Sequence, residues 1–344
     1  MYPKTKLGNV LELHRGYDLP ERERVDGNVP IISSSGYSGC HNEYKCEGEN
    51  VITGRYGTIG EVFFHEGKCW PLNTALYVSD YKGNYPKYIY YLLKYVLKLS
   101  TDGKDKSTVP GVDRNVLHQM NIPFCEDIDQ QRQSIKVLEN LDGRIKINKK
   151  VNDNLQQMAY AEYMHMFYSK RPNAKLGDVI VEHSKSSVQV GEAKEQPGNV
   201  PFFTSGDAIY RWTEPFVSDR SIFLNTGGNA DVKFYVGDAA YSTDTWCISG
   251  KDNLSDYVYL MLKSIKPELD QKFFQGTGLK HLQKPLLKDR LIYIPSNAEL
   301  EAFNADIQPW LSMVSDNIRE SEELTALRDW LLPMLMNGQA TIGD

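Results

Sequence analysis

The chain contains an internal repeat, and this repeat constrains its fold more than any other feature. Residues 6–10 (KLGNV) return as residues 175–179 (KLGDV), an offset of 175 − 6 = 169 positions. Three further pairs of similar blocks follow in the same order at nearly the same spacing: 29–36 with 200–206, 88–93 with 257–262, and 121–123 with 293–295. Because a near-constant offset over four blocks is typical of a tandem duplication, we predict two domains with the same fold.

Each copy has the same internal plan, which predicts a mixed α/β (α+β) domain. In the first copy, short runs at 50–53, 61–65 and 76–79 have the composition of β-strands and are separated by Gly and Asn. A helical pattern follows at 88–99. We therefore expect four parts along the chain: a first domain at 1–126, a long helix at 127–169, a second domain at 170–296 and a terminal helix at 297–344.

Each copy passes into a long helical stretch in which apolar and Asn residues recur every three or four positions, the spacing of a coiled-coil seam. In the first stretch these residues are Ile135, Leu138, Leu141, Ile145, Asn148, Asn152 and Leu155. In the second they are Phe303, Ile307, Leu311, Val314 and Ile318, and a further run with this spacing follows at Leu324, Leu327, Leu331 and Leu335. Pro309 is expected to break the second helix or to open its main segment, because proline is tolerated in a first turn and not inside a helix.

Two arrangements of these helices are open. Each could be an amphipathic helix that covers only its own domain. The second helix could instead run back along the first, which would give an antiparallel coiled coil and two domains related by a pseudo-two-fold axis. We expect this antiparallel pair. At 1.5 Å per residue, roughly 30 helical residues would then make a spacer of about 45 Å, slightly more than one turn of B-DNA at about 34 Å.

Composition excludes several classes of protein. The net charge of −6 argues against a protein that coats nucleic acid, although local basic patches could still contact DNA. No run approaches the roughly 18 apolar residues of a membrane span, and the first residues lack a signal-peptide pattern, so we expect a cytoplasmic protein. The five cysteines and seven histidines show no zinc-site spacing. We therefore predict reduced thiols and no metal.

Three runs resemble segments of one protein family. Residues 324–338 (LTALRDWLLPMLMNG) look like the C-terminal helix of the specificity (S, HsdS) subunits of type I restriction-modification systems. Residues 129–133 (DQQRQ) resemble the start of that family's central helix, and residues 54–60 (GRYGTIG) resemble a run in its target-recognition domains. The second copy departs from both patterns, with 298–301 (AELE) and 225–230 (NTGGNA) at these places.

The resemblance implies a role in DNA restriction and modification. Each target-recognition domain would read one half of a split, asymmetric site in double-stranded DNA. The helices would dock two methyltransferase subunits and set the spacing, and restriction subunits would join through the complex. The chain itself would be non-catalytic, with S-adenosylmethionine, ATP and Mg²⁺ on the partner subunits. Residues 121–124 (NIPF) are close to a methyltransferase base-holding loop, but no cofactor-binding Gly-rich turn precedes them.

DNA contacts are expected from polar loop side chains that can pair with base edges or phosphates. In the first copy these are Ser34, Ser35, Tyr37, Arg55, Tyr56, Lys104, Lys106 and Arg114. In the second copy they are Ser205, Arg211, Trp212, Asn225, Asn229, Lys280, His281 and Lys284. Arg55 and Lys280 are the strongest candidates because each lies in or beside a Gly-rich turn. For any single residue, an ordinary solvated surface role stays open.

The helices carry a second group of expected contacts. Leu138, Leu141, Ile145 and Leu155 are expected in the seam between the helices. Partner subunits are expected to contact Leu327, Trp330, Leu331 and Leu335, although these side chains could equally be buried against the first domain. The alternative function is a two-domain scaffold that binds proteins and not DNA, which predicts no salt-dependent affinity for duplex DNA.

Overall fold

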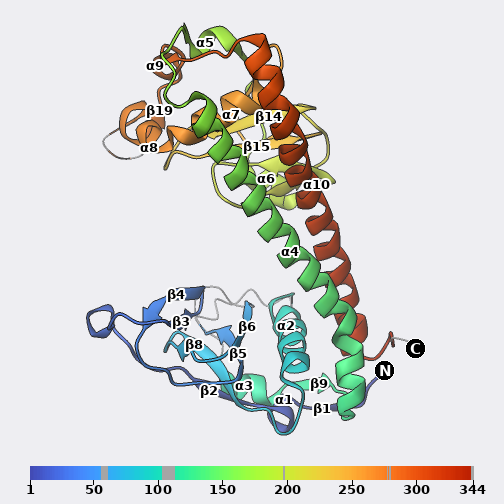
Figure 1. Cartoon of the computed structure of the whole chain (residues 1–344). Helices are drawn as coiled ribbons and strands as arrows, with labels where there is room; N and C mark the ends of the chain where they lie inside the picture. The colour runs from blue at the N-terminus through green and yellow to red at the C-terminus, as the bar shows by residue number, and fades with distance from the viewer. Residues whose placement is uncertain (56–60, 103–112, 197, 277, 279, 342–344) are drawn as a thin grey trace. The chain divides into compact units, whose positions relative to one another are not determined.

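The computed structural model describes residues 1–55, 61–102, 113–196, 198–276, 278 and 280–341 (Figure 1). The chain divides into two compact units. Unit 1 comprises residues 1–144 and 323–344, and unit 2 comprises residues 145–322. Two helices of 40 residues each, α4 (Ile128–Phe167) and α10 (Asn297–Met336), contribute residues to both units.

In the described part of unit 1, a four-stranded antiparallel sheet has the strand order β2-β8-β5-β6. Its strands are Glu12–Arg15, Ala75–Asp80, Glu49–Gly54 and Val62–Glu66, in that order. A second sheet, β4-β3-β7, consists of Gly36–His41, Val29–Ser33 and Trp70–Pro71. The remaining elements are β1 (Lys4–Lys6), β9 (Asn121–Pro123), α1 (Leu7–Val10), α2 (Pro86–Asp102), α3 (Arg114–Gln119) and a 3-10 turn at Glu21–Glu23.

The described part of unit 2 repeats this topology. Its main sheet, β11-β17-β14-β15, consists of Ile180–Glu182, Thr245–Gly250, Arg220–Asn225 and Val232–Val236. Its second sheet, β13-β12-β16, consists of Tyr210–Trp212, Val200–Phe203 and Ala240–Tyr241. The elements shared with unit 1 continue with β10 (Ala174–Lys175), α5 (Leu176–Val179), α7 (Ser255–Ser264), α9 (Lys284–Lys288) and β20 (Leu291–Ile292).

Several elements of unit 2 have no counterpart in the described part of unit 1. They are α6 (Val190–Glu195), α8 (Lys266–Glu268), a π-helical turn at Leu269–Phe273, β18 (Phe274–Gln275) and β19 (His281–Leu282). The matching strand orders of both sheets confirm the predicted duplication and the mixed α/β class. Of these elements, α6 lies against β13 of the second sheet of unit 2.

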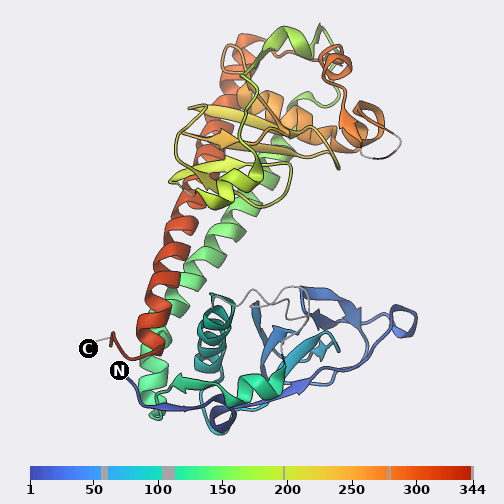
Figure 2. The same cartoon turned by 180° about the vertical axis from the view of Figure 1, so that it is seen from behind.

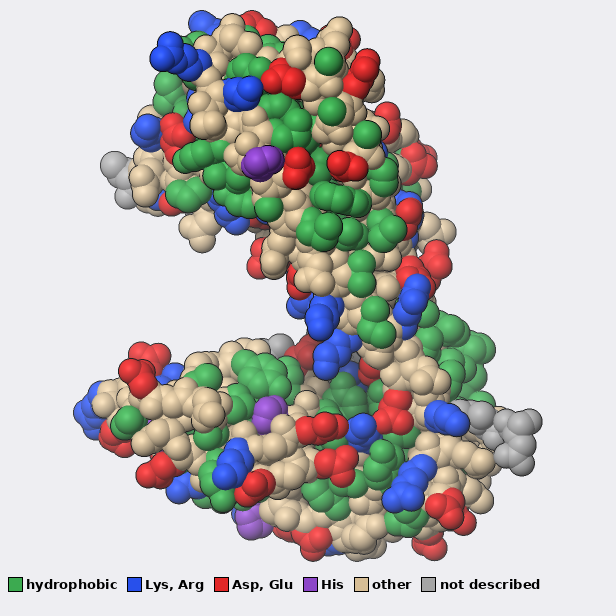
Figure 3. Space-filling view, in the orientation of Figure 1, with side chains coloured by type: hydrophobic (Ala, Val, Ile, Leu, Met, Phe, Trp, Pro, Cys, Tyr) green, Lys and Arg blue, Asp and Glu red, His purple; other side chains and the backbone are tan. Residues whose placement is uncertain are grey.

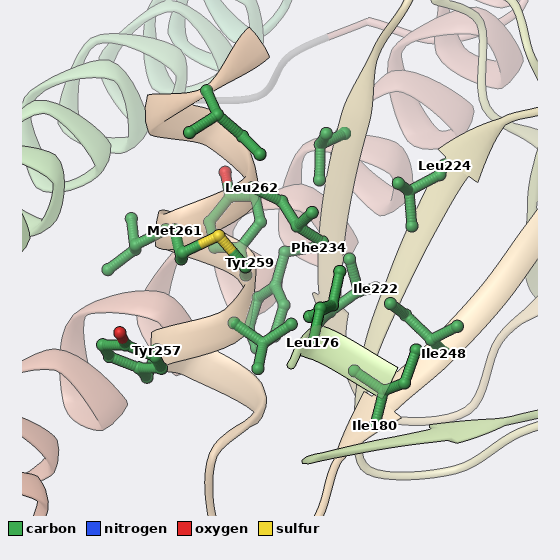
Figure 4. Close-up of a cluster of buried hydrophobic side chains, with 14 of the residues drawn as sticks. Leu176, Ile180, Ile222, Leu224, Phe234, Ile248, Tyr257, Tyr259, Met261 and Leu262 are labelled. Carbon is green, nitrogen blue, oxygen red and sulfur yellow. The ribbon is translucent and has the colours of Figure 1, made fainter. Parts of the chain in front are cut away.

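Successive side chains of a strand point to opposite faces of a sheet, and in each unit one face of the main sheet packs against a helix. In unit 2, Ile222, Phe234 and Ile248 of the sheet share one buried cluster with Tyr259 and Leu262 of α7 (Figure 4). The rings of Phe234 and Tyr259 stack with their centres 4.9 Å apart. In unit 1 the same arrangement places α2 on the main sheet, with sheet and helix side chains again in one cluster. The repeat therefore preserves the pattern that builds each core.

The two long helices pair in antiparallel fashion in each unit, as expected. In unit 2, Asn148 Nδ2 donates to Glu320 Oε2 (2.7 Å), and Asn152 Nδ2 donates to the carbonyl oxygen of Val314 (3.2 Å). Residue numbers thus fall along α10 as they rise along α4. Views from opposite sides show the two helices adjacent to one another within each unit (Figures 1 and 2). The start of α4 and the end of α10 also share the core of unit 1, so the pair covers domains as well.

The expectation for Pro309 is wrong, because α10 continues through it from Asn297 to Met336. Proline removes one backbone hydrogen bond, to residue 305, at a typical cost of about 3 kcal/mol. Pro309 and Ala305 both lie on the exposed side of the helix, where water can bind the freed carbonyl group. On the opposite side Ile307 and Leu311 are fully buried, and their packing offsets the loss.

Candidate nucleic-acid interface

In unit 2, loops that carry several predicted DNA contacts meet at one end of the main sheet. The Asn225 amide donates to the carbonyl oxygens of Ser205 (2.8 Å) and Asn229 (3.0 Å), which joins the loops after β12 and β14. Asn225 is only 5% exposed. Its side chain therefore holds the loops together, and it offers almost no surface to a ligand.

Strand β19 brings Lys280 and His281 to the same end of the sheet. The backbone N–H of Gly228 donates to the Lys280 carbonyl oxygen (3.1 Å), and Gly227 forms a β-bridge with His281. Both side chains are exposed, and Lys280 Nζ lies 3.3 Å from a carboxylate oxygen of Asp270. Because an exposed ion pair of this kind is weak, the Lys280 ammonium can exchange Asp270 for a DNA phosphate.

Lys284 begins α9 and borders a cavity beside this loop cluster. Its Nζ lies 5.1 Å from the centre of the Trp246 ring, and burial lowers the pKa of its ammonium group. Lys284, His281 and Thr226 line the cavity, whose volume is about 480 Å³. The structure thus brings together six of the eight predicted contacts of the second copy, namely Ser205, Asn225, Asn229, Lys280, His281 and Lys284.

The other two predicted contacts of unit 2 lie elsewhere. Arg211 and Trp212 belong to β13, where Trp212 pairs with Val200 at the start of β12, whereas Ser205 follows the end of that strand. Arg211 Nη2 lies 2.7 Å from Glu322 Oε2 of α10. The Trp212 ring packs on Phe202, with ring centres 6.1 Å apart. These two side chains thus contact α10 and the second sheet.

In unit 1, Thr74 joins three predicted contacts. Its hydroxyl oxygen accepts from the backbone N–H of Ser34 (3.3 Å), and its carbonyl oxygen accepts from the backbone N–H of Arg55 (2.9 Å). Ser35 follows in the same turn, between β3 and β4. This cluster lies at the ends of β3 and β5, which correspond to β12 and β14 of unit 2. The two units therefore gather polar loops at equivalent ends of their sheets.

Of the remaining contacts predicted in unit 1, Tyr37 lies on β4. It is 63% exposed, and its hydroxyl lies 3.1 Å from His65 Nδ1. Arg114 is exposed at the start of α3. Tyr56, Lys104 and Lys106 lie outside the described residues, as does Thr277 beside the predicted contact Lys280.

Arg114 and Lys284 occupy equivalent positions in the two units. A Cβ atom built on Gly8 would lie 3.1 Å from His118 Cβ, and one built on Gly177 would lie 3.2 Å from Lys288 Cβ. His118 and Lys288 are therefore counterparts, with an offset of 288 − 118 = 170. The same offset relates Arg114 to Lys284, since 284 − 114 = 170. Each unit thus begins this short helix with a cation.

The predicted partner residues of α10 divide into two groups. Leu335 is 2% exposed and lies in the core of unit 1, with Leu331 partly buried against it. Trp330 and Leu327 are instead 59% and 43% exposed. Burial against unit 1 thus applies to Leu335 and in part to Leu331, whereas contact of Trp330 and Leu327 with a partner stays a prediction.

The predicted seam residues of α4 are buried to different extents, although their spacing is regular. Leu138 is fully buried and Leu141 nearly so, whereas Ile145 and Leu155 are half-buried. Between them, the polar residues Asn148 and Asn152 are buried and hydrogen-bonded to α10. A buried asparagine in a helix seam favours one register over others.

Basic and acidic side chains are interspersed on the face of each unit that Figure 3 shows. The loop clusters therefore combine a few cations with polar groups, which suits readout of base edges together with phosphates. Among the described residues, we find no group of His, Cys, Asp and Glu that could hold a metal ion. Within the same residues, no helix is long and apolar enough to span a membrane.

The cavity wall in unit 2 was not singled out by the sequence patterns. Its residues Glu182, His183 and Lys185 lie at the end of β11 and just after it, about 100 positions before Lys284, and carry no local motif. Burial lowers the pKa of His183, whose Nε2 lies 2.6 Å from Ser249 Oγ. The repeat offset of 170 could have paired Lys284 with Arg114, but the wall itself depends on contacts between distant segments.

Comparison with known proteins gives three concordant findings. Residues 2–157 match the family model of the type I restriction modification DNA specificity domain. The type I restriction enzyme MjaIX specificity subunit of Methanocaldococcus jannaschii is 21% identical over 306 residues, covering 75% of this chain and 70% of that protein. The crystal structure of a type I restriction-modification system S subunit from M. genitalium matches with a TM-score of 0.60 at 16% identity, covering 98% of this chain and 96% of that chain. The family resemblance and the fold are thereby confirmed.

Proposed function

Because this chain carries a type I restriction-modification DNA specificity domain, we propose that it is the specificity subunit of such a complex and reads a bipartite, asymmetric DNA site. Units 1 and 2 would each read one half-site in double-stranded DNA. The observation that carries this proposal is the repeated loop cluster. Ser34, Ser35 and Arg55 in unit 1 lie at the same end of the sheet as Ser205 and Asn229 in unit 2.

Differences between the clusters support an asymmetric site. The scaffold strands keep their order in both units, whereas the loop residues differ in type and charge. Base edges in the major groove are distinguished by the donors and acceptors that face them. Two domains with different loop side chains would thus select two different half-sites.

We infer that methyltransferase subunits dock on α4 and α10, and that restriction subunits join through the assembled complex. The exposed Trp330 and Leu327 on α10 fit this role, since aromatic and apolar anchors dominate protein interfaces. S-adenosylmethionine, ATP and Mg²⁺ would be held by those partners, and this chain would contribute recognition without catalysis.

The decisive experiment is a selection from a random duplex library. The chain would be purified with its methyltransferase subunit, and bound duplexes would be sequenced after selection at near-physiological salt. We expect a split motif with a constant gap and an affinity that falls steeply with salt. A continuous motif would restrict reading to one unit. No enrichment from an assembled complex would favour the alternative, a protein-binding scaffold.

Arg55→Ala tests the assignment of unit 1 in the same selection. We expect the variant to discriminate between bases in one half-site roughly 10- to 100-fold less well. This corresponds to the loss of about 1–3 kcal/mol that is typical of a bidentate base contact. The other half-site and assembly with the methyltransferase should be unchanged. Lys68→Ala, which removes an exposed cation elsewhere in unit 1, is the matched control. An unchanged motif for Arg55→Ala would refute this role.

A further inference from the structure

The cavity of about 480 Å³ in unit 2 is formed by three segments that are far apart in sequence. Residues 182–185 comprise the last residue of β11 and the loop after it, residues 243–247 comprise the start of β17 and the loop before it, and residues 281–284 run from β19 to the first residue of α9. Thr226, which follows β14 of the loop cluster, closes one side. The cavity, which we call the Lys284 cavity, therefore opens next to the loops proposed to read DNA.

The Lys284 cavity has two cations with no carboxylate partner. Among the described residues, no Asp or Glu oxygen lies within 4.0 Å of Nζ of Lys284 or Lys185. Burial lowers the pKa of the Lys284 ammonium, the charge of Glu182 raises it, and the charge of Lys185 lowers it. An anion between the two would compensate both charges.

The acidic residue in the wall is already neutralised. Glu182 Oε1 lies 2.7 Å from Nζ of Lys288, and Glu182 Oε2 accepts from the indole N–H of Trp246 (3.0 Å). The hydrogen bond from Lys288 lowers the pKa of Glu182, so this carboxylate stays charged and bound to its partners. Its charge offsets part of the positive charge of the two lysines, and with Glu182, Lys185 and Lys284 as its charged residues the wall carries a net positive charge.

Neutral donors complete the wall. The side chains of Thr243 and Ser184 place hydroxyl groups along it, and the imidazole of His281 is exposed at its border. Two ammonium groups with hydroxyl and imidazole donors form the donor set that phosphate oxygens accept from.

We propose that the Lys284 cavity binds a phosphate ester between Lys284 and Lys185, and that in the DNA complex this is a backbone phosphate bordering the half-site of unit 2. The DNA assignment rests on the proposed function, whereas the phosphate-binding chemistry rests on the cavity alone. Such a contact positions the strand without reading its sequence. A free mononucleotide offers the same phosphate chemistry, and the volume leaves room for its sugar.

The described part of unit 1 has other residues at two positions of this wall. Leu13 stands at the strand position of Glu182, since Leu13 pairs with Val78 as Glu182 pairs with Ile248. His118 stands at the position of Lys288 and accepts from the backbone N–H of Leu13 (3.0 Å). Arg114, the cation at the start of the short helix, corresponds to Lys284. Within the described residues, the wall that combines Glu182 with two lysines is found in unit 2.

The first test is neutralisation of each lysine in the complete complex with the methyltransferase. For Lys284→Gln we expect roughly fivefold to tenfold weaker binding to the selected duplex and a log–log salt slope reduced by about 1, with an unchanged motif. Lys185→Gln should act in the same direction. Lys272→Gln, which removes an exposed cation paired with Glu268, is the matched control and should have little effect. A changed motif would overturn the proposal, because it would make Lys284 a base contact.

The second test locates the bound phosphate in the DNA and distinguishes a backbone phosphate from the phosphate of a free nucleotide. Duplexes carrying one neutral methylphosphonate at a time would be bound to the wild-type complex and to Lys284→Gln. At one position in the duplex, the methylphosphonate should weaken binding to the wild-type complex. The same substitution should have almost no further effect on binding to Lys284→Gln. A second outcome is that no methylphosphonate position depends on Lys284, but thymidine monophosphate binds the wild-type chain and not Lys284→Gln. The cavity would then bind the phosphate of a free nucleotide and not a phosphate of the DNA backbone.

Failure of both arms would overturn the phosphate-ester site. The proposed function is tested separately, because it fails only if the wild-type complex shows no sequence-selective, salt-dependent binding to DNA. Binding of thymidine monophosphate can still be measured in that case, so the cavity proposal keeps its own outcome.

Discussion

Units 1 and 2 share their strand orders but differ at the positions where polar side chains are buried. Unit 2 buries an ion pair between Arg220 and Asp256, with Nε 2.6 Å from Oδ2 and the Asp256 side chain fully buried. The residue of unit 1 that corresponds to Asp256 is Lys87, which precedes Tyr88 as Asp256 precedes Tyr257. Lys87 forms a half-buried pair with Glu139 (3.3 Å). After duplication, the apolar framework was thus retained while the polar interactions that lock it diverged.

The largest expected difference concerns these ion pairs. Asp256→Ala should lower the stability of unit 2 by about 3–5 kcal/mol, because it leaves the Arg220 guanidinium buried without its partner. Lys87→Ala should cost unit 1 at most about 1 kcal/mol, since its pair is accessible to solvent. Hydrogen exchange of peptides from each unit, measured over a series of urea concentrations, would give the loss in free energy of unfolding for each variant. Equal losses of stability in the two units would contradict the conclusion that the buried pair of unit 2 contributes more than the half-buried pair of unit 1.

The start of the long helix gives the next difference. Gln131 of α4 is fully buried, accepts from the backbone N–H of Tyr85 (3.0 Å) and donates to Asn84 Oδ1 (2.8 Å). In unit 2 the corresponding position, 131 + 169 = 300, is Leu300 in the apolar core. Gln131→Leu should destabilise unit 1 by about 1–3 kcal/mol, because the buried groups lose their partner.

The same hydrogen-exchange titration measures the effect of Gln131→Leu, with the exposed Lys136→Leu as control. If unit 1 tolerates the leucine as well as unit 2 does, the amide is dispensable and the two helix starts are interchangeable.

A third difference lies on α10, whose exposed Trp330 and Leu327 belong to unit 1. Trp330→Ala should weaken binding of the methyltransferase about tenfold, or about 1.4 kcal/mol, without lowering the stability of unit 1. Val116→Ala removes another exposed apolar side chain of unit 1 and serves as control. Titration of labelled methyltransferase into the purified chain would measure the affinities. Equal binding of wild type and Trp330→Ala would remove Trp330 from the interface.

The smallest expected effect is a pH dependence of stability that arises from Glu299 at the start of α10. Glu299 accepts from the backbone N–H (2.9 Å) and hydroxyl (2.8 Å) of Ser296, which lower its pKa to about 2. A carboxylate with a lowered pKa stabilises the folded state above its ordinary pKa near 4.5, and this contribution is lost as the pH falls toward 2. The Tm of Glu299→Gln should therefore be lower than that of wild type at pH 6, and the gap should narrow below about pH 4.5. A constant gap between pH 6 and pH 2.5 would contradict this assignment.

Much of the fold was predictable because it depends on local and periodic patterns. The blocks at 6–10 and 175–179 predicted the duplication, and the strand runs correspond to β5, β6 and β8. The spacing of Ile135 and Leu138 predicted a buried helix face. Pro309 misled the prediction because local propensity is outweighed when the opposite face of the helix is buried.

The arrangement of the candidate DNA-contact residues was less predictable, because residue type does not reveal which loops meet. Ser205, Asn225 and Asn229 were expected as equivalent contacts, yet Asn225 is buried and ties the other two together. Arg211 and Lys280 were expected in one interface, but β13 and β19 place them in different parts of unit 2.

The sequence by itself determined that this protein has two copies of one mixed α/β unit, each followed by a long helix, because repeated blocks and apolar spacing are properties of the linear chain. Only the tertiary structure decided that Lys284 and Lys185 line one cavity and that Trp330 is exposed while Leu335 is buried. These facts depend on contacts between segments that are distant in sequence, and on which side of each helix other elements occupy. No local pattern carries that information.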